Sequence, residues 1–124
     1  MPTIAIATAP LAPARRRAIA LRLTRWLVDR GVRADRVVVR FEPPAEVYAG
    51  GWPVAEHTTV TCCVGPDRDE AFRAGLAAHV TATLGGTGLV YLELRTTAPA
   101  DVYVRAGGQL TRADRPAPAQ EGTA

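Results

Sequence analysis

The sequence has no lysine: each of its fifteen basic residues is an arginine. A codon bias in a high-GC genome explains this absence. A need for guanidinium groups is the alternative, because guanidinium binds planar carboxylates and phosphates better than ammonium does. The sequence leaves both explanations open.

Cysteines are few, and long apolar runs and a secretory signal are absent. The two cysteines, Cys62 and Cys63, are neighbours on opposite faces of a predicted strand, with no histidine or acidic residue at metal-ligand spacing. No apolar run approaches the roughly 20 residues of a membrane span, and the N-terminus lacks a secretory pattern. We therefore expect a cytoplasmic protein with reduced thiols, no bound metal and no membrane contact.

The charge that is present is concentrated in the first half. Residues 1–55 hold nine arginines and four acidic residues, whereas residues 56–124 hold six arginines and eight acidic residues. A half this basic favours an acidic partner. Because no aromatic side chains alternate with the arginines and no nucleic-acid-binding motif occurs, we predict a small anionic or carbonyl substrate and no nucleic acid.

A shift of 55 residues aligns the chain with itself, which indicates an internal repeat. The segment 44–48 (PAEVY) falls on 99–103 (PADVY), and a Gly-Gly pair follows each segment. The same shift pairs Arg40 with Arg95, Gly31 with Gly86, Leu21 with Leu76, and Pro2 with His57. The sequence therefore predicts two tandem units, 1–55 and 56–115, followed by a disordered tail over 116–124.

Each unit has the pattern of a strand, a helix and a second strand. β-Branched residues predict first strands over 3–8 and 58–64, and alternating apolar residues predict second strands over 36–42 and 89–96. Apolar stripes predict one helix from about Pro13 to Gly31, and another from an N-cap at Asp67 to Gly85-Gly86.

Strand–helix–strand connections of this length imply parallel strand pairs with right-handed crossovers. The predicted fold is therefore α/β (α+β), a tandem β-α-β repeat that forms a four-stranded sheet with both helices on one face. The second face of the sheet mixes polar and apolar residues. We expect that face to pack against other subunits.

Pro2 directly follows the initiator methionine, and a small second residue permits removal of Met1. The mature chain would then begin with a secondary amine at the head of a strand. An α-amino group has a pKa of about 7.7–8.0, and burial or nearby arginine charge would lower it and leave a neutral base near pH 7. Many proteins begin Met-Pro without this role, so the dipeptide supports a catalytic proline only together with the motifs that follow it.

Met-Pro, a short strand, an amphipathic helix, a second strand and a turn ending in Gly-Gly together resemble the tautomerase superfamily. The run 39–51 (VRFEPPAEVYAGG) resembles fused two-unit members of the 4-oxalocrotonate tautomerase-like family, of the malonate semialdehyde decarboxylase and cis-3-chloroacrylic acid dehalogenase types. The resemblance covers residues 2–115. It implies a homotrimer without a cofactor, in which the N-terminal proline is the catalytic residue.

The resemblance also implies arginines that bind the substrate carboxylate. Arg68 lies near the position of one of them, but Gly65 replaces the second, which is expected three residues earlier. The strand arginine of single-unit members falls on Val37, and Arg36 or Arg40 would substitute only with a shift. The helix histidine that helps to activate water in the dehalogenases falls near Leu27, which argues against dehalogenation.

We predict from these residues a cofactor-independent tautomerase, an isomerase that acts on a small carbonyl or carboxylate substrate. Pro2 is the predicted general base, and the predicted substrate-binding residues are Arg68, Arg40, Arg95, Tyr48 and Tyr103. Salt bridges between subunits explain Arg40 and Arg95 as well as substrate binding does. Two alternatives stay open: a hydratase or decarboxylase of a short 3-oxo or unsaturated acid, and a non-catalytic oligomeric binding protein with the same fold.

Overall fold

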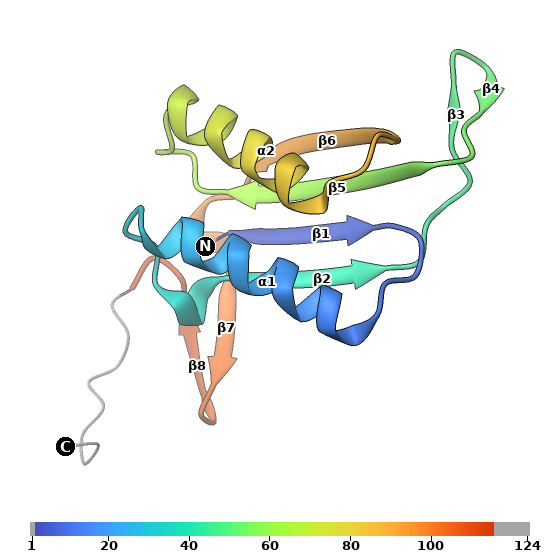
Figure 1. Ribbon diagram of the computed structural model, residues 1–124. Helices are drawn as coiled ribbons and strands as arrows, with labels where there is room; N and C mark the ends of the chain where they lie inside the picture. Colours follow the sequence, from blue (N-terminus) through green and yellow to red (C-terminus); the bar gives the residue numbers. More distant parts are fainter. Residues whose placement is uncertain (1, 116–124) are drawn as a thin grey trace.

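Two strand–helix–strand units share one sheet in the computed structural model, which describes residues 2–115 (Figure 1). The elements in chain order are β1 (Thr3–Ala7), α1 (Pro13–Val28), the 3₁₀ helix η1 (Ala34–Arg36), β2 (Val38–Glu42), β3 (Tyr48–Ala49), β4 (Trp52–Pro53), β5 (His57–Val64), α2 (Glu70–Leu84), β6 (Leu89–Thr96), the 3₁₀ helix η2 (Pro99–Asp101), β7 (Tyr103–Ala106) and β8 (Gln109–Arg112). The predicted tail over 116–124 lies outside the described residues. No helix in the described part of the chain is long and apolar enough to cross a membrane.

The four-stranded sheet has the order β2-β1-β5-β6, and each unit contributes one parallel pair. The two units join where β1 and β5 lie antiparallel at the centre of the sheet. Both helices lie on the same face of the sheet (Figure 1). The predicted fold, a tandem β-α-β repeat with a four-stranded sheet and two helices on one face, is therefore confirmed.

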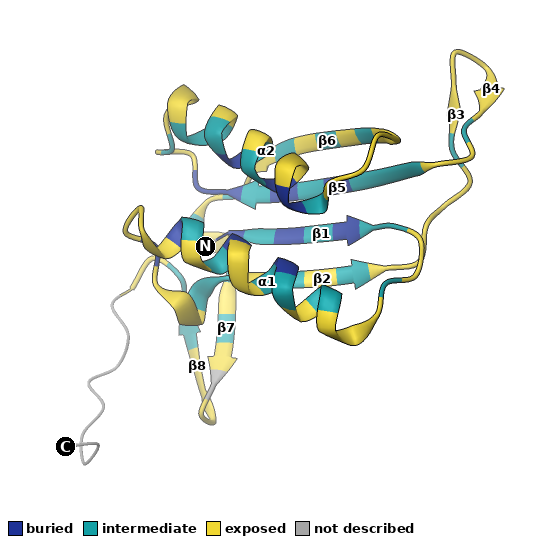
Figure 2. Ribbon diagram, in the orientation of Figure 1, coloured by how far each residue is buried: buried dark blue, intermediate teal, exposed yellow. Residues whose placement is uncertain are grey.

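The core lies between the helices and the central strands, where Figure 2 shows the buried residues. Alternate side chains of β1 and β5 point to the helices, and every third or fourth side chain of each helix points back. The buried apolar side chains are Ile4, Ile6, Ile19, Leu23, Leu27, Val32, Val60, Cys62, Val64, Leu76 and Val80. Cys62 is buried and Cys63 is half-buried, and neither forms a disulfide in the structure.

The first helix ends as the sequence predicts. Gly31 has a φ of 88°, a left-handed conformation that glycine adopts without a steric penalty. The N–H of Val32 donates to the carbonyl of Leu27 (3.1 Å), and that of Gly31 donates to Val28 (3.0 Å). This pair of bonds is the Schellman pattern, with Gly31 as the residue after the cap.

The predicted N-cap of the second helix was wrong by two residues. Asp69, not Asp67, precedes the first helical residue, and its carboxylate accepts a hydrogen bond from the N–H of Phe72 (2.8 Å). Both aspartates suit a helix start, and only the backbone path of the loop decides between them. The second strand of the first unit also starts later than predicted, at Val38, because η1 occupies residues 34–36.

The 55-residue shift does not hold through the first half of each unit. Thr3 pairs with Val38, an offset of 35, whereas Thr61 pairs with Glu93, an offset of 32. If Arg40 and Arg95 remain equivalent, the first strands must align with a shift of 58. This larger shift pairs the buried Ile4 and Ile6 with the buried Cys62 and Val64.

Two of the predicted residue pairs are therefore wrong. Pro2 corresponds to Val60, inside β5, and not to His57. Leu21 is 52% exposed whereas Leu76 is fully buried, so these leucines are not equivalent either. The buried stripe of α1 falls on that of α2 with a shift of 57, which pairs Ile19 with Leu76 and Leu23 with Val80. The shift falls from 58 to 57 and then to 55 because the second unit is shorter by one residue between its first strand and its helix, and by two residues between its helix and its second strand.

Each unit ends in a short hairpin, β3–β4 or β7–β8, that turns at a Gly-Gly pair. Gly50 and Gly51 have φ values of 58° and 85°, and Gly107 and Gly108 have 61° and 83°. Two consecutive positive φ angles define the type I′ turn that matches the twist of a two-residue hairpin. The hairpins project from opposite ends of the sheet (Figure 1).

Gly75 lets the two helices pack closely beside an aromatic cluster. Trp26 of α1 lies 5.5 Å from Phe72 and 5.6 Å from the stacked ring of His79, measured between ring centroids. A Cβ at position 75 would lie 3.1 Å from Cζ2 of Trp26. The ring cannot move easily, since side chains of α2 and Arg30 hold it from several sides.

We expect Gly75→Leu to destabilise the protein, because a larger side chain would push Trp26 out of this cluster. Overpacking of this kind costs about 1–3 kcal/mol. Ala74→Leu is the matched control, since Ala74 is the exposed neighbour on the same helix. Urea unfolding should show a lower midpoint for Gly75→Leu only. Equal midpoints would show that Trp26 yields freely.

Candidate active site

Pro2 lies at the head of the central strand β1 and is buried. Its carbonyl oxygen accepts a hydrogen bond from the N–H of Val38 (3.2 Å), which ties the start of β1 to the start of β2. The pairing of β1 with its neighbours therefore fixes the position of the Pro2 nitrogen. This nitrogen can act as a base only if Met1 is removed, because a peptide nitrogen has no basicity.

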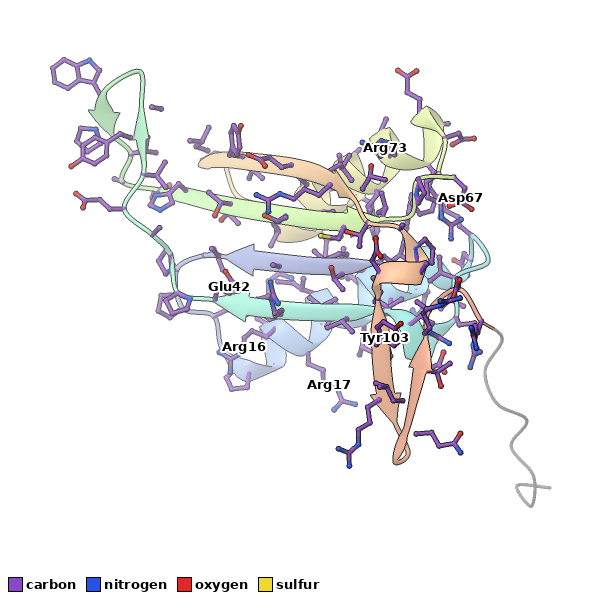
Figure 3. All side chains as sticks on the ribbon, turned by 180° about the vertical axis from the view of Figure 1, so that it is seen from behind. Arg16, Arg17, Glu42, Asp67, Arg73 and Tyr103 are labelled. Atoms are coloured by element: carbon purple, nitrogen blue, oxygen red, sulfur yellow. The ribbon has the colours of Figure 1, made fainter. Side chains whose placement is uncertain are left out.

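The topology brings Arg68, Arg95 and Tyr103 to the same end of the sheet as Pro2. Because β5 and β6 run antiparallel to β1, their C-terminal ends lie beside the start of β1. Thr3 pairs with Cys63, and Cys63 pairs with Arg95. The 65–69 loop that carries Arg68 follows β5, and the β7 strand that begins with Tyr103 follows β6 and η2 (Figure 3).

The structure places Tyr48 at the other end of the sheet and Arg40 between the two ends. Tyr48 follows the C-terminal end of β2, which is parallel to β1. A five-residue strand spans about 16 Å, so the Tyr48 hairpin does not reach Pro2 of its own chain. Arg40 pairs with Ala5, in the middle of β1. The separation of Tyr48 from Pro2 follows from the parallel pair within the first unit, whereas the position of Tyr103 depends on the antiparallel contact between the units.

Arg40 and Arg95 each have a carboxylate partner on their own strand. Nε of Arg40 lies 3.2 Å from Oε1 of Glu42, and Nη2 of Arg95 lies 3.5 Å from Oε2 of Glu93. All four side chains stand on the face of the sheet that the helices leave uncovered. Exposed pairs of this kind contribute about 0–1 kcal/mol, so a substrate or a neighbouring subunit can displace either carboxylate.

Arg68 is held by an aromatic ring. Its guanidinium carbon lies 4.6 Å from the centroid of Phe72, over the ring, an arrangement that stabilises the charge while its N–H groups stay open to a ligand. No carboxylate among the described residues lies within 4 Å of it. Of the predicted arginines, Arg68 is therefore the best placed to bind an anion beside Pro2.

Gly65 stands where the resemblance implies a second arginine. A Cβ at this position would lie 2.7 Å from Oδ1 of Asp67, so any side chain here would have to displace that carboxylate. The carboxylate also places a negative charge in the loop of Arg68. This loop therefore differs from the expected pair of arginines in both shape and charge.

The two tyrosines are exposed to the same extent, 58%, but their hydroxyl groups have different partners. The hydroxyl of Tyr48 donates to Oε1 of Glu46 (2.8 Å), and this bond raises the pKa of the phenol. Tyr103 pairs with Arg112 across the β7–β8 hairpin. The pKa of Arg112 is raised, first by Asp114 and to a smaller extent by Tyr103.

Two arginines at the Pro2 end were not among the predicted site residues. Arg73 of α2 donates from Nη1 to Oγ1 of Thr96 (3.4 Å), at the C-terminal end of β6. Arg36 of η1 has a buried Nη1, the one buried side-chain nitrogen or oxygen in the described residues without a hydrogen-bond partner. Arg36 was expected on a strand, where it could replace the strand arginine of the single-unit members only with a shift, but it lies in η1. Neither position follows from strand alternation, which explains why the pattern missed them.

The described residues contain no group of three histidine, cysteine or acidic side chains that could hold a metal ion. The end of the sheet near Pro2 presents guanidinium groups, the phenol of Tyr103 and, if Met1 is removed, a secondary amine. Such a set can bind a carboxylate and transfer a proton next to it.

Comparison with known proteins gives matches among solved structures only; no family model and no curated protein matches. The Q0 fused 4-OT wild type symmetric trimer is 23% identical, over 90% of this chain and 98% of that chain, with a TM-score of 0.69. Pt0534, inactivated by 2-oxo-3-pentynoate, is 19% identical over 86% of this chain and 93% of that chain (TM-score 0.65). FG41 malonate semialdehyde decarboxylase, inhibited by 3-bromopropiolate, is 19% identical over 86% and 90% (TM-score 0.60). This chain therefore has the fold of these solved structures, a fused 4-OT and a malonate semialdehyde decarboxylase among them.

Proposed function

We propose that the chain is a cofactor-independent tautomerase in which Pro2, freed by removal of Met1, is the general base. The observation that carries this proposal is the position of Pro2, buried at the head of β1 and at the same end of the sheet as Arg68. The neutral amine removes a proton from the carbon next to a carbonyl group. It then returns the proton to another atom of the same substrate, so the reaction needs no cofactor.

The arginines at this end support a carboxylate or enolate substrate. Arg68 is stacked but unpaired within the described residues, and Arg36 has an unpartnered N–H group. A guanidinium fork binds a carboxylate through two parallel hydrogen bonds, and the same donors stabilise the negative charge of an enolate. The agents that modify or inhibit Pt0534 and FG41 malonate semialdehyde decarboxylase are short unsaturated acids. We infer a substrate of this size class.

We further propose that the active form is a homotrimer. The uncovered face of the sheet exposes large apolar side chains on both of its edge strands, Val38 on β2 and Leu89 and Tyr91 on β6, and burial of such side chains favours association. The Q0 fused 4-OT is a symmetric trimer. In such an assembly Tyr48 would serve a site of a neighbouring subunit, since it lies far from Pro2 of its own chain.

A second candidate, decarboxylation of a short 3-oxo acid, is supported by the likeness to FG41 malonate semialdehyde decarboxylase. In that reaction the protonated form of Pro2 would act as the acid, and an arginine would hold the carboxylate. Tautomerisation and decarboxylation need opposite protonation states of the same nitrogen. Their rates should therefore respond to pH in opposite directions.

The proposal is tested by a direct assay of the purified chain. Mass spectrometry first establishes that Met1 is absent, and ketonisation of a phenyl-substituted enol pyruvate is then followed by its ultraviolet absorbance. We expect saturable catalysis at neutral pH. Decarboxylation of malonate semialdehyde is measured in parallel. Activity on the second substrate alone would replace the tautomerase proposal, and activity on neither would favour a binding protein.

A further inference from the structure

A recess of about 240 Å³ lies at the end of the sheet opposite Pro2. It forms where the loop after β1, the first turn of α1 and the segment after β2 meet. Its walls include Thr8, Leu11, Arg16, Phe41, Pro43 and Pro44. None of these residues belongs to the site proposed around Pro2.

Arg16 gives this recess its main polar group. It is half-buried, and its Nη1 donates to the carbonyl oxygen of Leu11 (2.7 Å). That bond fixes the guanidinium but uses only one of its five N–H groups. No carboxylate in the described part of the chain lies within 4 Å of Arg16. The remaining N–H groups are available to a ligand.

The neighbouring charges leave this recess positive. Glu42 also lines it, but Oε1 of Glu42 lies 3.2 Å from Nε of Arg40, which offsets the negative charge. Arg15 is directed to α2, where its Nη2 donates to the carbonyl of Thr83 (2.9 Å). Figure 3 shows Arg16 and Glu42 near the C-terminal end of β2.

The rest of the wall is apolar and stiff. Leu11 and Phe41 pack against the core, and prolines have fixed φ angles. A recess with one guanidinium and an apolar wall suits a ligand with one anionic group and a short hydrocarbon part. Its volume is below the usual range for drug-sized ligands, about 300–1,000 Å³. Such a ligand is a small monocarboxylate.

The repeat relates this recess to the Pro2 end of the sheet. With the shift of 57 that aligns the two helices, Arg16 corresponds to Arg73, which lies at the Pro2 end and contacts Thr96. The residue that corresponds to Pro2 is Val60, whose nitrogen is inside the ladder of β5. The recess therefore has an arginine, Arg16, in the position equivalent to Arg73. It cannot have a free amine equivalent to that of Pro2.

We propose that the recess at Arg16 is a second, non-catalytic site that binds a small monocarboxylate. The guanidinium of Arg16 binds the carboxylate, and Phe41 with the prolines contacts the hydrocarbon part. This binding does not depend on removal of Met1 or on activity at Pro2. The proposal of a second site is therefore independent of the proposed function and can be tested separately.

Benzoate is the probe for the test, added to the full-length ¹⁵N-labelled protein while amide chemical shifts are recorded. We expect saturable shifts in residues 8–11 and 41–44. Arg16→Gln should weaken this binding at least tenfold, whereas Arg17→Gln, a change at the exposed neighbour on the same helix, should leave it unchanged. Ala9 also lines the recess, so Ala9→Trp fills it without removing charge and should abolish the shifts.

Two further measurements separate this site from other sources of binding. Arg68→Gln removes an anchor near Pro2 and should leave the shifts in residues 8–11 intact. Inorganic phosphate, which has no hydrocarbon part, should bind at least tenfold more weakly than benzoate. Equal affinity of Arg16→Gln and the unaltered chain, shifts confined to residues 65–69, or equal binding of phosphate would each overturn the proposal.

Discussion

Retention of Met1 is expected to lower kcat/KM for ketonisation by at least about 100-fold, since a positioned general base contributes about 10²- to 10⁴-fold to a proton transfer. Insertion of a leucine between Met1 and Pro2 gives such a chain, because a large second residue prevents methionine removal. The nitrogen of Pro2 then becomes a peptide nitrogen and loses its basicity. The bond between the Pro2 carbonyl and the Val38 N–H stays available, so β1 should still pair with β2.

Pro2→Ala should give an intermediate rate. It keeps a free amine, but a primary amine rotates about the N–Cα bond, whereas the pyrrolidine ring fixes the direction of the nitrogen lone pair. Pro13→Ala is the matched control, because Pro13 is an exposed proline at the start of α1, far from the proposed chemistry.

The pH profile provides a second readout. A base must be neutral, so kcat/KM should rise with pH through the pKa of the Pro2 amine and then level off. The chain that retains Met1 should lack this rise. Equal rates and equal profiles in all chains, with folding intact, would exclude Pro2 as the base.

The fold could be predicted well from the sequence because its signals are local and redundant. Helix α1 starts at Pro13, as predicted, and the Gly31 stop depends only on the backbone freedom of glycine. The errors arose where two local choices were equivalent. Asp67 and Asp69 are equally good caps by composition, and only the path of the loop selects Asp69.

The candidate site was harder to predict because it depends on contacts between distant segments. The antiparallel pairing of β1 with β5 brings Tyr103 to the end of the sheet where Pro2 lies, whereas the parallel pairing of β1 with β2 places Tyr48 at the other end. The repeat itself concealed this difference, because it made the two tyrosines look interchangeable. The position of Arg36 could not be predicted either, since it lies in a 3₁₀ helix and does not follow the alternation of side chains along a strand.

The helices hold the sheet that positions Pro2, so their buried stripes should dominate the stability of the protein. Leu23 is fully buried in α1, between Ile19 and Leu27 of the same stripe. These side chains pack in one cluster with Ile4 and Ile6 of β1. Loss of volume here would loosen the contact between α1 and the strand that Pro2 begins.

Leu23→Ala is expected to lower the free energy of unfolding by about 2–5 kcal/mol, through the lost burial of the side chain and the cavity that remains. Leu21→Ala removes the same atoms from the same helix but should cost far less, because Leu21 is 52% exposed. Urea unfolding of both variants at one fixed protein concentration measures the difference, since association would otherwise change the apparent stability. A larger loss for Leu21→Ala would mean that the outer face of α1 is buried against another subunit, and that the buried stripe does not dominate the stability.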